Sequence, residues 1–217
     1  MSICDLNLNI KEAPKNSLSI YVHIPFCNSK CAYCSFVSVV GTEDDKKKYF
    51  SDLVNEIKIK SKEYKSHYTV SSIYIGGGTP TILSEEQLEK LLSTVSECYD
   101  VSKLEEYTFE GGRPDTISAE KLRIAKKHGV TRVSVNTQSL SDEVLKSIGR
   151  DHSADDFFRA YNIAAESGAN ARFPRTAFNN YRVFYAHYCT LFFLSARRLS
   201  RSATRLASSG ALIFHIS

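Results

Sequence analysis

The 217-residue sequence has no tryptophan, one methionine and five prolines, and no hydrophobic run long enough to span a bilayer. Its longest apolar stretch, residues 183–194, is too short for that and contains a histidine. The N-terminal segment has no apolar centre flanked by small residues, so we expect no secretory signal, no membrane partner and a cytoplasmic protein. The 42% share of hydrophobic residues is typical of globular proteins and argues against disorder.

Acidic residues are missing from the C-terminal part of the chain. Residues 171–217 contain seven arginines, no lysine and no acidic residue, a net charge of +7. Residues 1–170 carry 21 basic against 24 acidic side chains, a net charge of −3. One interpretation is a basic surface for nucleic acid, but the arginines and aromatic residues are not ordered on one face, so we predict no nucleic-acid partner.

The C-terminal segment also has no clear hydrophobic period and no capping residues. We interpret it as foreign to the fold that precedes it, through a frame change or a chimeric junction in the source sequence. The predicted organisation is an N-terminal extension over 1–16, a core over 17–170 and an atypical basic tail over 171–217.

Segments rich in β-branched and aromatic residues alternate with segments of helical period. The predicted strands are 17–26, 70–75, 104–110 and 131–137. The predicted helices lie around 50–57, 88–98, 118–129, 141–149 and 153–168. Strands separated by helices require right-handed crossovers, so we predict an α/β fold with a parallel sheet whose functional residues lie at the C-terminal ends of the strands.

Three of the six cysteines, Cys27, Cys31 and Cys34, follow the first predicted strand within eight residues. Three thiolates so close together are the usual anchor of an iron-sulfur cluster, and they leave one iron of a four-iron cluster open to a substrate or cofactor. Structural zinc with His23 as fourth ligand is the alternative, but His23 lies inside a predicted strand. The other cysteines are interpreted as small hydrophobic residues or free thiols and not as ligands, with Cys98 on the apolar stripe of its helix.

Glycines end the second predicted strand. Gly76, Gly77 and Gly78 precede Thr79, and residues without a Cβ let a ligand approach the backbone. The run lacks the Lys-Ser/Thr of a phosphate-binding loop, and a plain tight turn is the alternative interpretation. Its position on the same predicted sheet edge as the cysteines favours a ligand site.

Polar residues end the next two predicted strands. Glu110 ends the third and Gln138 follows the fourth, while Arg150 comes after the short helix that follows. A carboxylate and an amide can bind a polar ligand, and an arginine can bind its carboxylate, although each side chain alone is equally explained by loop structure. Four consecutive strands that end in such residues favour one shared site.

The motifs YVHIPFCNSKCAYCSF, YIGGGTPT, FEGGRPDTI, SVNTQS and IGRDHS resemble, in this order, those of the radical S-adenosylmethionine superfamily. Within it they are similar to the oxygen-independent coproporphyrinogen III oxidase or dehydrogenase group. The resemblance covers residues 17–168. FEGGRPD and SVNTQS depart from the Asn-Pro and Gly-Val-Gln forms of the main oxidase and resemble the dehydrogenase subgroup of low-GC Gram-positive bacteria.

This resemblance implies that the three cysteines hold a [4Fe-4S] cluster whose fourth iron binds the amine and carboxylate of S-adenosyl-L-methionine. The cofactor-binding residues that it implies are Tyr21, Tyr33, Phe36, Gly76, Gly77, Gly78, Thr79, Glu110, Gln138 and Arg150. Tyr33 would lie near the adenine. Tyr21 and Phe36 are equally explained as packed residues of the core.

The implied activity is the oxidative decarboxylation of coproporphyrinogen III to protoporphyrinogen IX, with a porphyrinogen as substrate. An electron from a reduced flavodoxin-like or ferredoxin-like donor would cleave the sulfonium and give a 5′-deoxyadenosyl radical. That radical would take a hydrogen from a propionate, which then loses CO2. The alternative is a heme-binding chaperone of the same superfamily.

The resemblance also implies a partial (β/α) barrel of six parallel strands. Here four βα units are recognisable, so we expect a barrel truncated after about four units, without the last two strands and the C-terminal substrate domain. Such a chain is expected to show little or no turnover. An aggregating truncation product is a further alternative, because a parallel sheet that stops there has an exposed edge.

Overall fold

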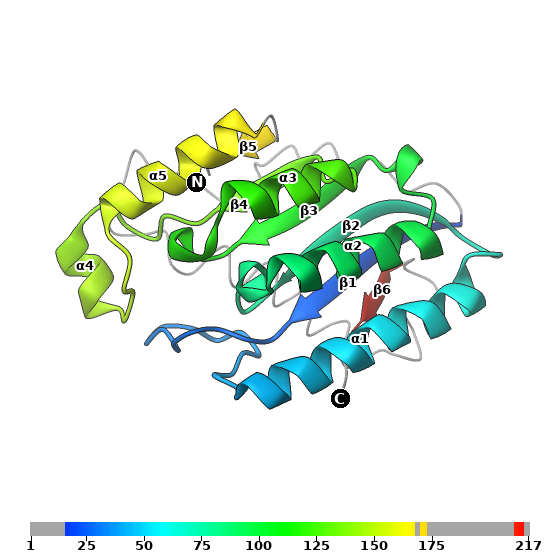
Figure 1. The fold of residues 1–217 in the computed structure, drawn as a ribbon, viewed down its shortest axis with the longest axis horizontal. Coiled ribbons are helices and arrows are strands. Elements are labelled where there is room, and N and C mark those ends of the chain that lie inside the picture. The colour runs from blue at the N-terminus through cyan, green and yellow to red at the C-terminus, as the bar shows by residue number, and fades with distance from the viewer. Residues whose placement is uncertain (1–15, 168–169, 173–210, 215–217) are drawn as a thin grey trace, which may run out of the picture.

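The computed structural model describes residues 16–167, 170–172 and 211–214, and all of its named strands lie in one parallel sheet (Figure 1). Across the sheet the strands follow the order β5-β4-β3-β2-β1-β6. Their bounds are β1 Ser17–Ile24, β2 Thr69–Gly77, β3 Glu106–Gly111, β4 Arg132–Val135, β5 Asn170–Arg172 and β6 Ala211–Phe214. The predicted α/β class with a parallel sheet is confirmed, and β1 to β4 are the four predicted strands.

Helices connect these strands where the hydrophobic period predicts them. The α-helices are α1 Glu43–Tyr64, α2 Glu85–Cys98, α3 Ala119–Lys127, α4 Asp142–Ser147 and α5 Ala154–Glu166. Short 3-10 turns are η2 Pro80–Ile82, η3 Val101–Lys103 and η4 Pro114–Thr116. The loops that follow β2 and β3 each enter such a turn at a proline, whose restricted φ suits the first helical position.

Side-chain caps set where the helices begin. The Ser84 hydroxyl accepts a hydrogen bond from the backbone N–H of Gln87, whose side chain accepts one from the backbone N–H of Ser84. Ser153 and Asp156 form the same reciprocal pair ahead of α5. These caps satisfy N–H groups that the first turn of a helix leaves unpaired.

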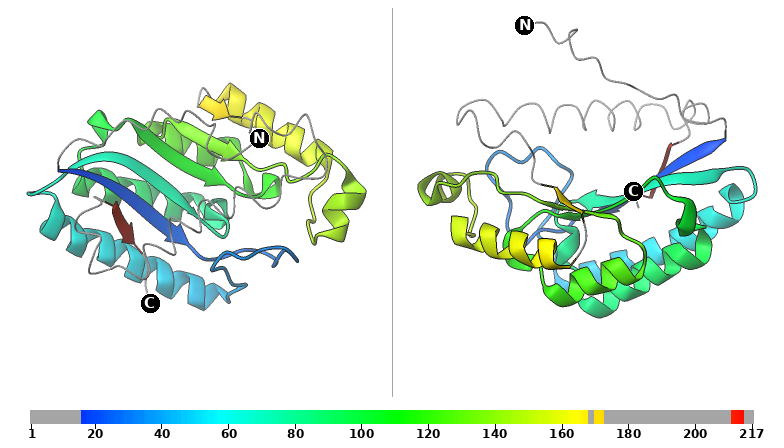
Figure 2. Two further views of the ribbon diagram at one scale, coloured as in Figure 1. Left: turned by 180° about the vertical axis from the view of Figure 1, so that it is seen from behind. Right: turned by 90° about the horizontal axis from the view of Figure 1, so that it is seen from above.

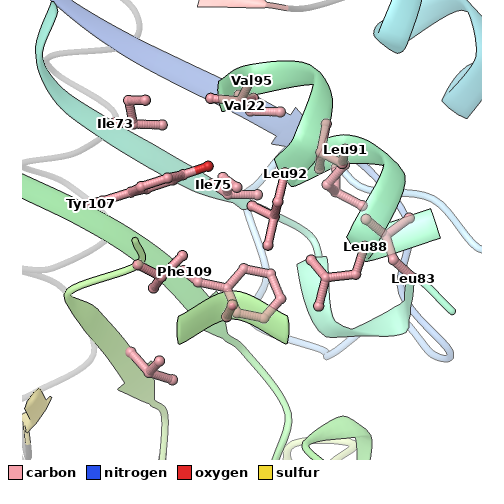
Figure 3. Packing of buried hydrophobic residues seen from close by; sticks show 14 of the residues in the cluster. Val22, Ile73, Ile75, Leu83, Leu88, Leu91, Leu92, Val95, Tyr107 and Phe109 are labelled. Atoms are coloured by element: carbon pink, nitrogen blue, oxygen red, sulfur yellow. The ribbon is translucent and has the colours of Figure 1, made fainter. Parts of the chain in front are cut away.

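Helices α1, α2, α3 and α5 cover one face of the sheet (Figure 2). Alternate strand residues face them and form the hydrophobic core, in which Val22, Ile75 and Phe109 pack near Leu88 and Leu92 of α2 (Figure 3). Cys98 packs against this core, as its place on the apolar stripe predicts.

Polar and aromatic side chains occupy the opposite face, which we call the inner face. It carries Ser19, Tyr21, His23, Ser72, Tyr74, Glu106, Thr108, Glu110, Arg132 and Ser134. Among the residues that the structure describes, no helix covers this face (Figure 2). Parallel register aligns Tyr21 with Tyr74 and Tyr74 with Thr108, so side chains of adjacent strands meet there.

Two short edge strands extend the sheet beyond the four predicted strands. β5 pairs with β4 and crosses the predicted boundary at residue 170, and β6, within the predicted basic tail, pairs with β1. At three and four residues, both are too short to give a hydrophobic period. Residues 1–15 of the predicted extension, and residues 173–210 and 215–217 of the tail, lie outside the described residues, so the domain boundaries stay predictions. Where helices are described, none has the length and apolar character needed to cross a membrane.

Candidate functional site

The cysteine loop, residues 25–39, begins directly after β1. Two backbone hydrogen bonds close it on itself: Cys27 N–H donates to the Val39 carbonyl over 3.0 Å, and Val39 N–H donates to the Pro25 carbonyl over 2.8 Å. The Lys30 ammonium donates within the loop to the Phe36 carbonyl over 3.1 Å and the Ser38 carbonyl over 2.9 Å. Within the loop, its own backbone and Lys30 thus hold the chain in place.

Cys27 is buried beside the glycine edge, the run Gly76–Gly78 at the end of β2. Its sulfur accepts a hydrogen bond from the Thr79 hydroxyl over 3.3 Å. A Cβ on Gly78 would lie 2.8 Å from this sulfur and 2.7 Å from the Phe26 carbonyl oxygen. The missing side chain of Gly78 thus provides the space that the Cys27 sulfur occupies.

Cys31 and Cys34 receive donors from other segments. The buried sulfur of Cys31 accepts from Nη2 of Arg113, in the loop after β3, over 3.3 Å. The half-buried Cys34 lies 3.9 Å, sulfur to oxygen, from the Ser38 hydroxyl. Each of the three sulfurs therefore faces a hydrogen-bonding side chain, an environment suited to sulfur ligands that carry negative charge.

Zinc with His23 is not favoured by the geometry. His23 Nε2 donates to the Val37 carbonyl over 3.0 Å, and Nδ1 lies 3.2 Å from the Tyr21 hydroxyl. Because a carbonyl oxygen can only accept, the proton of the neutral ring is assigned to Nε2. Both ring nitrogens are thus engaged. Within residues 16–167, no three Cys, His, Asp or Glu side chains are grouped closely enough to hold a single metal ion, and this applies to Cys27, Cys31 and Cys34 as well.

The glycine edge makes room for Glu110. A Cβ on Gly76 would lie 2.8 Å from Oε2 of Glu110 and 2.5 Å from the ring of Tyr74. Gly77 has a φ of 125°, which an L side chain rarely adopts, and a Cβ there would meet the Ile24 carbonyl oxygen at 2.6 Å. The space beside these glycines is thus taken by atoms of the protein itself, and their predicted role in binding a ligand stays a prediction.

The Glu110 carboxylate is surrounded by donors. Oε2 accepts from the Tyr74 hydroxyl over 3.5 Å, Oε1 accepts from the Asn136 amide over 3.3 Å, and the backbone N–H of Gly77 also donates to this group. By surface area the residue is only half-buried, but protein atoms pack densely around its carboxyl group. Burial raises the pKa of Glu110 from 4.5 to about 7, against the opposing effect of these donors and of Arg150.

Arg150 connects two parts of the site. Its Nε and Nη2 donate to the Tyr33 hydroxyl over 3.2 and 2.9 Å, and its Nη1 donates to the Gly112 carbonyl over 2.9 Å. The chain segment after β4 is thereby joined to the cysteine loop and to the loop after β3. Two predicted cofactor residues, Tyr33 and Arg150, are in direct contact.

Tyr21 lies on the inner face of β1, where its ring stacks on Tyr74 at a centroid distance of 5.9 Å. Burial and the nearby Glu110 raise the pKa of the Tyr21 hydroxyl far above its ordinary value, so it remains a hydrogen-bond donor. Phe36 is half-buried in the cysteine loop. Gln138 follows β4 with a left-handed φ of 59°, an uncommon conformation that functional loops often contain.

Sequence reasoning missed several residues of the site. It assigned no role to Arg113, Tyr74, Asn136, Ser38 or Lys30. The alternation along β2 and along the predicted strand 131–137 places Tyr74 and Asn136 on the same face as Glu110, a signal available in the sequence. Arg113 stands in the unusual FEGGRPD motif, but only the fold brings it to Cys31.

Comparison with known proteins gives one family. The model of the Radical SAM superfamily matches residues 21–178. The oxygen-independent coproporphyrinogen-III oxidase-like protein HemZ of Bacillus subtilis is 38% identical over 160 residues, which are 72% of this chain and 32% of that protein. The heme chaperone HemW of the same organism is 40% identical over 151 residues, or 69% of this chain and 39% of that protein.

A solved structure agrees with these relatives. The coproporphyrinogen III oxidase HemN of Escherichia coli, described as a Radical SAM enzyme, matches with a TM-score of 0.63 and 29% identity. The match covers 71% of this chain and 36% of that one. The chain thus spans about a third of the length of the relatives that it matches.

Proposed function

Because this chain belongs to the Radical SAM superfamily, we propose that Cys27, Cys31 and Cys34 hold a [4Fe-4S] cluster and that S-adenosyl-L-methionine binds beside it. The cofactors predicted from the sequence are those of the family. The observation that carries the proposal is the convergence of three loops on the cysteine loop. Thr79, in the loop after β2, donates a hydrogen bond to Cys27, and Arg113, in the loop after β3, donates one to Cys31. Arg150, in the segment after β4, donates to the Tyr33 hydroxyl.

The chain's own residues have distinct tasks at this edge. Ionised Glu110 would accept hydrogen bonds from the cofactor's ammonium group, and Arg150 would pair with a carboxylate. Tyr21, Phe36 and Gln138 complete the predicted contacts. When bound, the cluster and S-adenosylmethionine supply one-electron cleavage of the sulfonium and abstraction of a hydrogen atom. The electron is expected from a reduced flavodoxin-like or ferredoxin-like donor in the cytoplasm.

We infer that the whole protein acts in porphyrin metabolism, by oxidative decarboxylation of coproporphyrinogen III. The similarity to HemZ and the FEGGRPD motif support this activity. Heme binding and transfer is the second candidate, and the similarity to the heme chaperones of several bacteria supports it. Since the chain spans about a third of the length of these relatives, we propose cofactor binding and cleavage of S-adenosylmethionine for the chain itself and the decarboxylation for the whole protein.

Anaerobic reconstitution of the full chain with iron and sulfide tests the proposal. About four irons per chain, broad visible absorption and 5′-deoxyadenosine formed after dithionite reduction are expected. The Cys27→Ser, Cys31→Ser and Cys34→Ser variants should lose the cluster. Cys98→Ser is the matched control and should keep the cluster, because Cys98 is the last residue of α2 and packs against the hydrophobic core, away from the cysteine loop.

Failure of the wild-type chain to bind iron, or binding that survives all three substitutions, would refute the cluster assignment. Adding coproporphyrinogen III or heme to the loaded protein separates the two candidate functions. Vinyl products support the dehydrogenase, and stoichiometric heme binding without turnover supports the chaperone.

A further inference from the structure

Arg113 is a buried cation in contact with a cysteine sulfur. The residue is 2% exposed and comes from the loop after β3. Its Nη2 donates to the Ser29 carbonyl over 2.7 Å and to the Cys31 sulfur over 3.3 Å. Both acceptors belong to the cysteine loop, so one guanidinium attaches the β3 loop to the segment that carries the cysteines.

The positive charge of Arg113 is poorly compensated by acidic residues. Its salt-bridge partner is Asp151, at 4.0 Å from Nη1, and the side chain of Asp151 is 80% exposed. A buried guanidinium cannot lose its proton, and burying it is costly unless an anion balances it. The buried Cys31 sulfur, 3.3 Å from Nη2, is placed to supply that negative charge as a cluster ligand.

We propose that Arg113 is a positioning residue that raises the reduction potential of a [4Fe-4S] cluster held through Cys31, an inference that rests on the proposed function. Reduction adds one electron and increases the negative charge on the ligating sulfurs. A hydrogen-bonded cation stabilises the reduced form more than the oxidised form, and hydrogen bonds to cluster sulfurs are among the factors that set such potentials. Arg113 therefore makes the electron easier to accept.

The other two sulfurs provide an internal comparison. Cys27 accepts from the neutral hydroxyl of Thr79, and Cys34 lies 3.9 Å from the neutral hydroxyl of Ser38. Hydrogen bonds from charged donors are about twice as strong as those between neutral groups. The contribution of Arg113 is thus expected to exceed that of Thr79.

The test compares midpoint potentials of the reconstituted full chain in anaerobic titrations with dithionite, which supplies the single electron, followed by electron paramagnetic resonance. Arg113→Met removes the charge and the donors. It should make reduction about tenfold less favourable, a shift of about 59 mV to lower potential for a one-electron couple. Arg113→Lys keeps the charge but loses the planar donor group and should shift the potential less.

Arg123→Met is the matched control, because Arg123 is an exposed residue of α3 paired with Glu120. The midpoint potential of this variant should equal that of the wild type.

An unchanged potential in Arg113→Met would overturn the inference while leaving the cluster assignment intact. A wild-type chain without a cluster would overturn both. If Arg113→Met does not fold, as judged by circular dichroism, Arg113→Gln decides, because it removes the charge but keeps a polar side chain, and a potential equal to that of the wild type overturns the inference.

Discussion

The Arg150 guanidinium donates two hydrogen bonds to the Tyr33 hydroxyl, 117 positions earlier in the sequence, over 3.2 and 2.9 Å. A third donor of the same group reaches the Gly112 carbonyl over 2.9 Å. Its planar shape allows one side chain to hold both loops at fixed relative positions. The relative position of the cysteine loop and the segment after β4, at the C-terminal ends of the strands, therefore depends on this contact.

Removing the Tyr33 hydroxyl is predicted to weaken cofactor binding. Tyr33→Phe keeps the ring but leaves two donors of Arg150 without this acceptor, so the guanidinium is less well ordered for a carboxylate. The loss of a hydrogen bond to a charged group suggests a decrease in affinity for S-adenosylmethionine of about tenfold. Calorimetric titration of the cluster-loaded protein measures it. Tyr68→Phe, in the turn before β2, is the control, and an equal decrease there would contradict the prediction.

The affinity for S-adenosylmethionine is predicted to rise as the pH increases through about 7. Burial raises the pKa of Glu110 to about 7, so at lower pH the carboxyl group is protonated in the free protein and must lose its proton before it can pair with an ammonium group. Titrations between about pH 6 and pH 7.5 span this change while the ammonium of the ligand remains largely protonated. The dissociation constant should fall across this range.

Glu110→Gln isolates the contribution of the carboxylate. The variant should bind more weakly at pH 7.5 and lose the pH dependence, whereas a dependence that persists in the variant would assign the titration to another group. The free energy of unfolding depends on pH in the opposite direction. The pKa of Glu110 in the folded protein exceeds its unfolded value of 4.5, so the contribution of Glu110 to stability is present below pH 4.5 and is lost as the pH rises through about 7.

Much of the fold is visible in the sequence because its signals are local. The strands β1 to β4 follow β-branched and aromatic runs, and the Ser84 and Ser153 caps need only residues three positions away. Cys27, Cys31 and Cys34 lie within eight residues of the sequence, so the proposal of a common site for them needs no tertiary information. The edge strands β5 and β6 are too short to produce such a signal, and their pairing depends on the rest of the sheet.

The contacts around the cysteines are the part that sequence could not supply. Arg113 meets Cys31 across 82 positions and Thr79 meets Cys27 across 52, so each contact exists only because parallel strands bring their C-terminal ends together. The raised pKa of Glu110 likewise depends on packing and not on its neighbours in sequence. Residue type indicates what such groups can do, and only the fold shows what they touch.

Adding a methyl group at Gly78 is predicted to reduce cluster binding. In Gly78→Ala the new Cβ would lie 2.8 Å from the Cys27 sulfur and 2.7 Å from the Phe26 carbonyl oxygen, so the cysteine loop must move away from β2. The iron content after anaerobic reconstitution should fall well below that of the wild type. Gly112→Ala is the milder control, because its Cβ would come no closer than 3.3 Å to another atom, the Gly78 carbonyl oxygen. Equal iron contents in the two variants would show that the loop tolerates the methyl group.

Tyr107→Phe is predicted to stabilise the chain. Tyr107 is fully buried in the core beside Ile73 and Ile75 (Figure 3), and its hydroxyl has no hydrogen-bond partner among the residues that the structure describes. Burial also raises the pKa of this hydroxyl far above its ordinary value. A buried unsatisfied polar group costs about 1–3 kcal/mol, and phenylalanine keeps the shape of the ring. The free energy of unfolding in urea should therefore rise by about 1 kcal/mol.

Tyr49→Phe is the matched control for this change. The Tyr49 hydroxyl donates to the His23 carbonyl over 2.8 Å, so its removal leaves a backbone oxygen without that partner and should lower the free energy of unfolding by about 1 kcal/mol. The two substitutions delete the same atom from the same type of residue and are expected to act in opposite directions. A decrease in both variants would mean that the Tyr107 hydroxyl is satisfied in solution, by water or by a part of the chain outside the described residues.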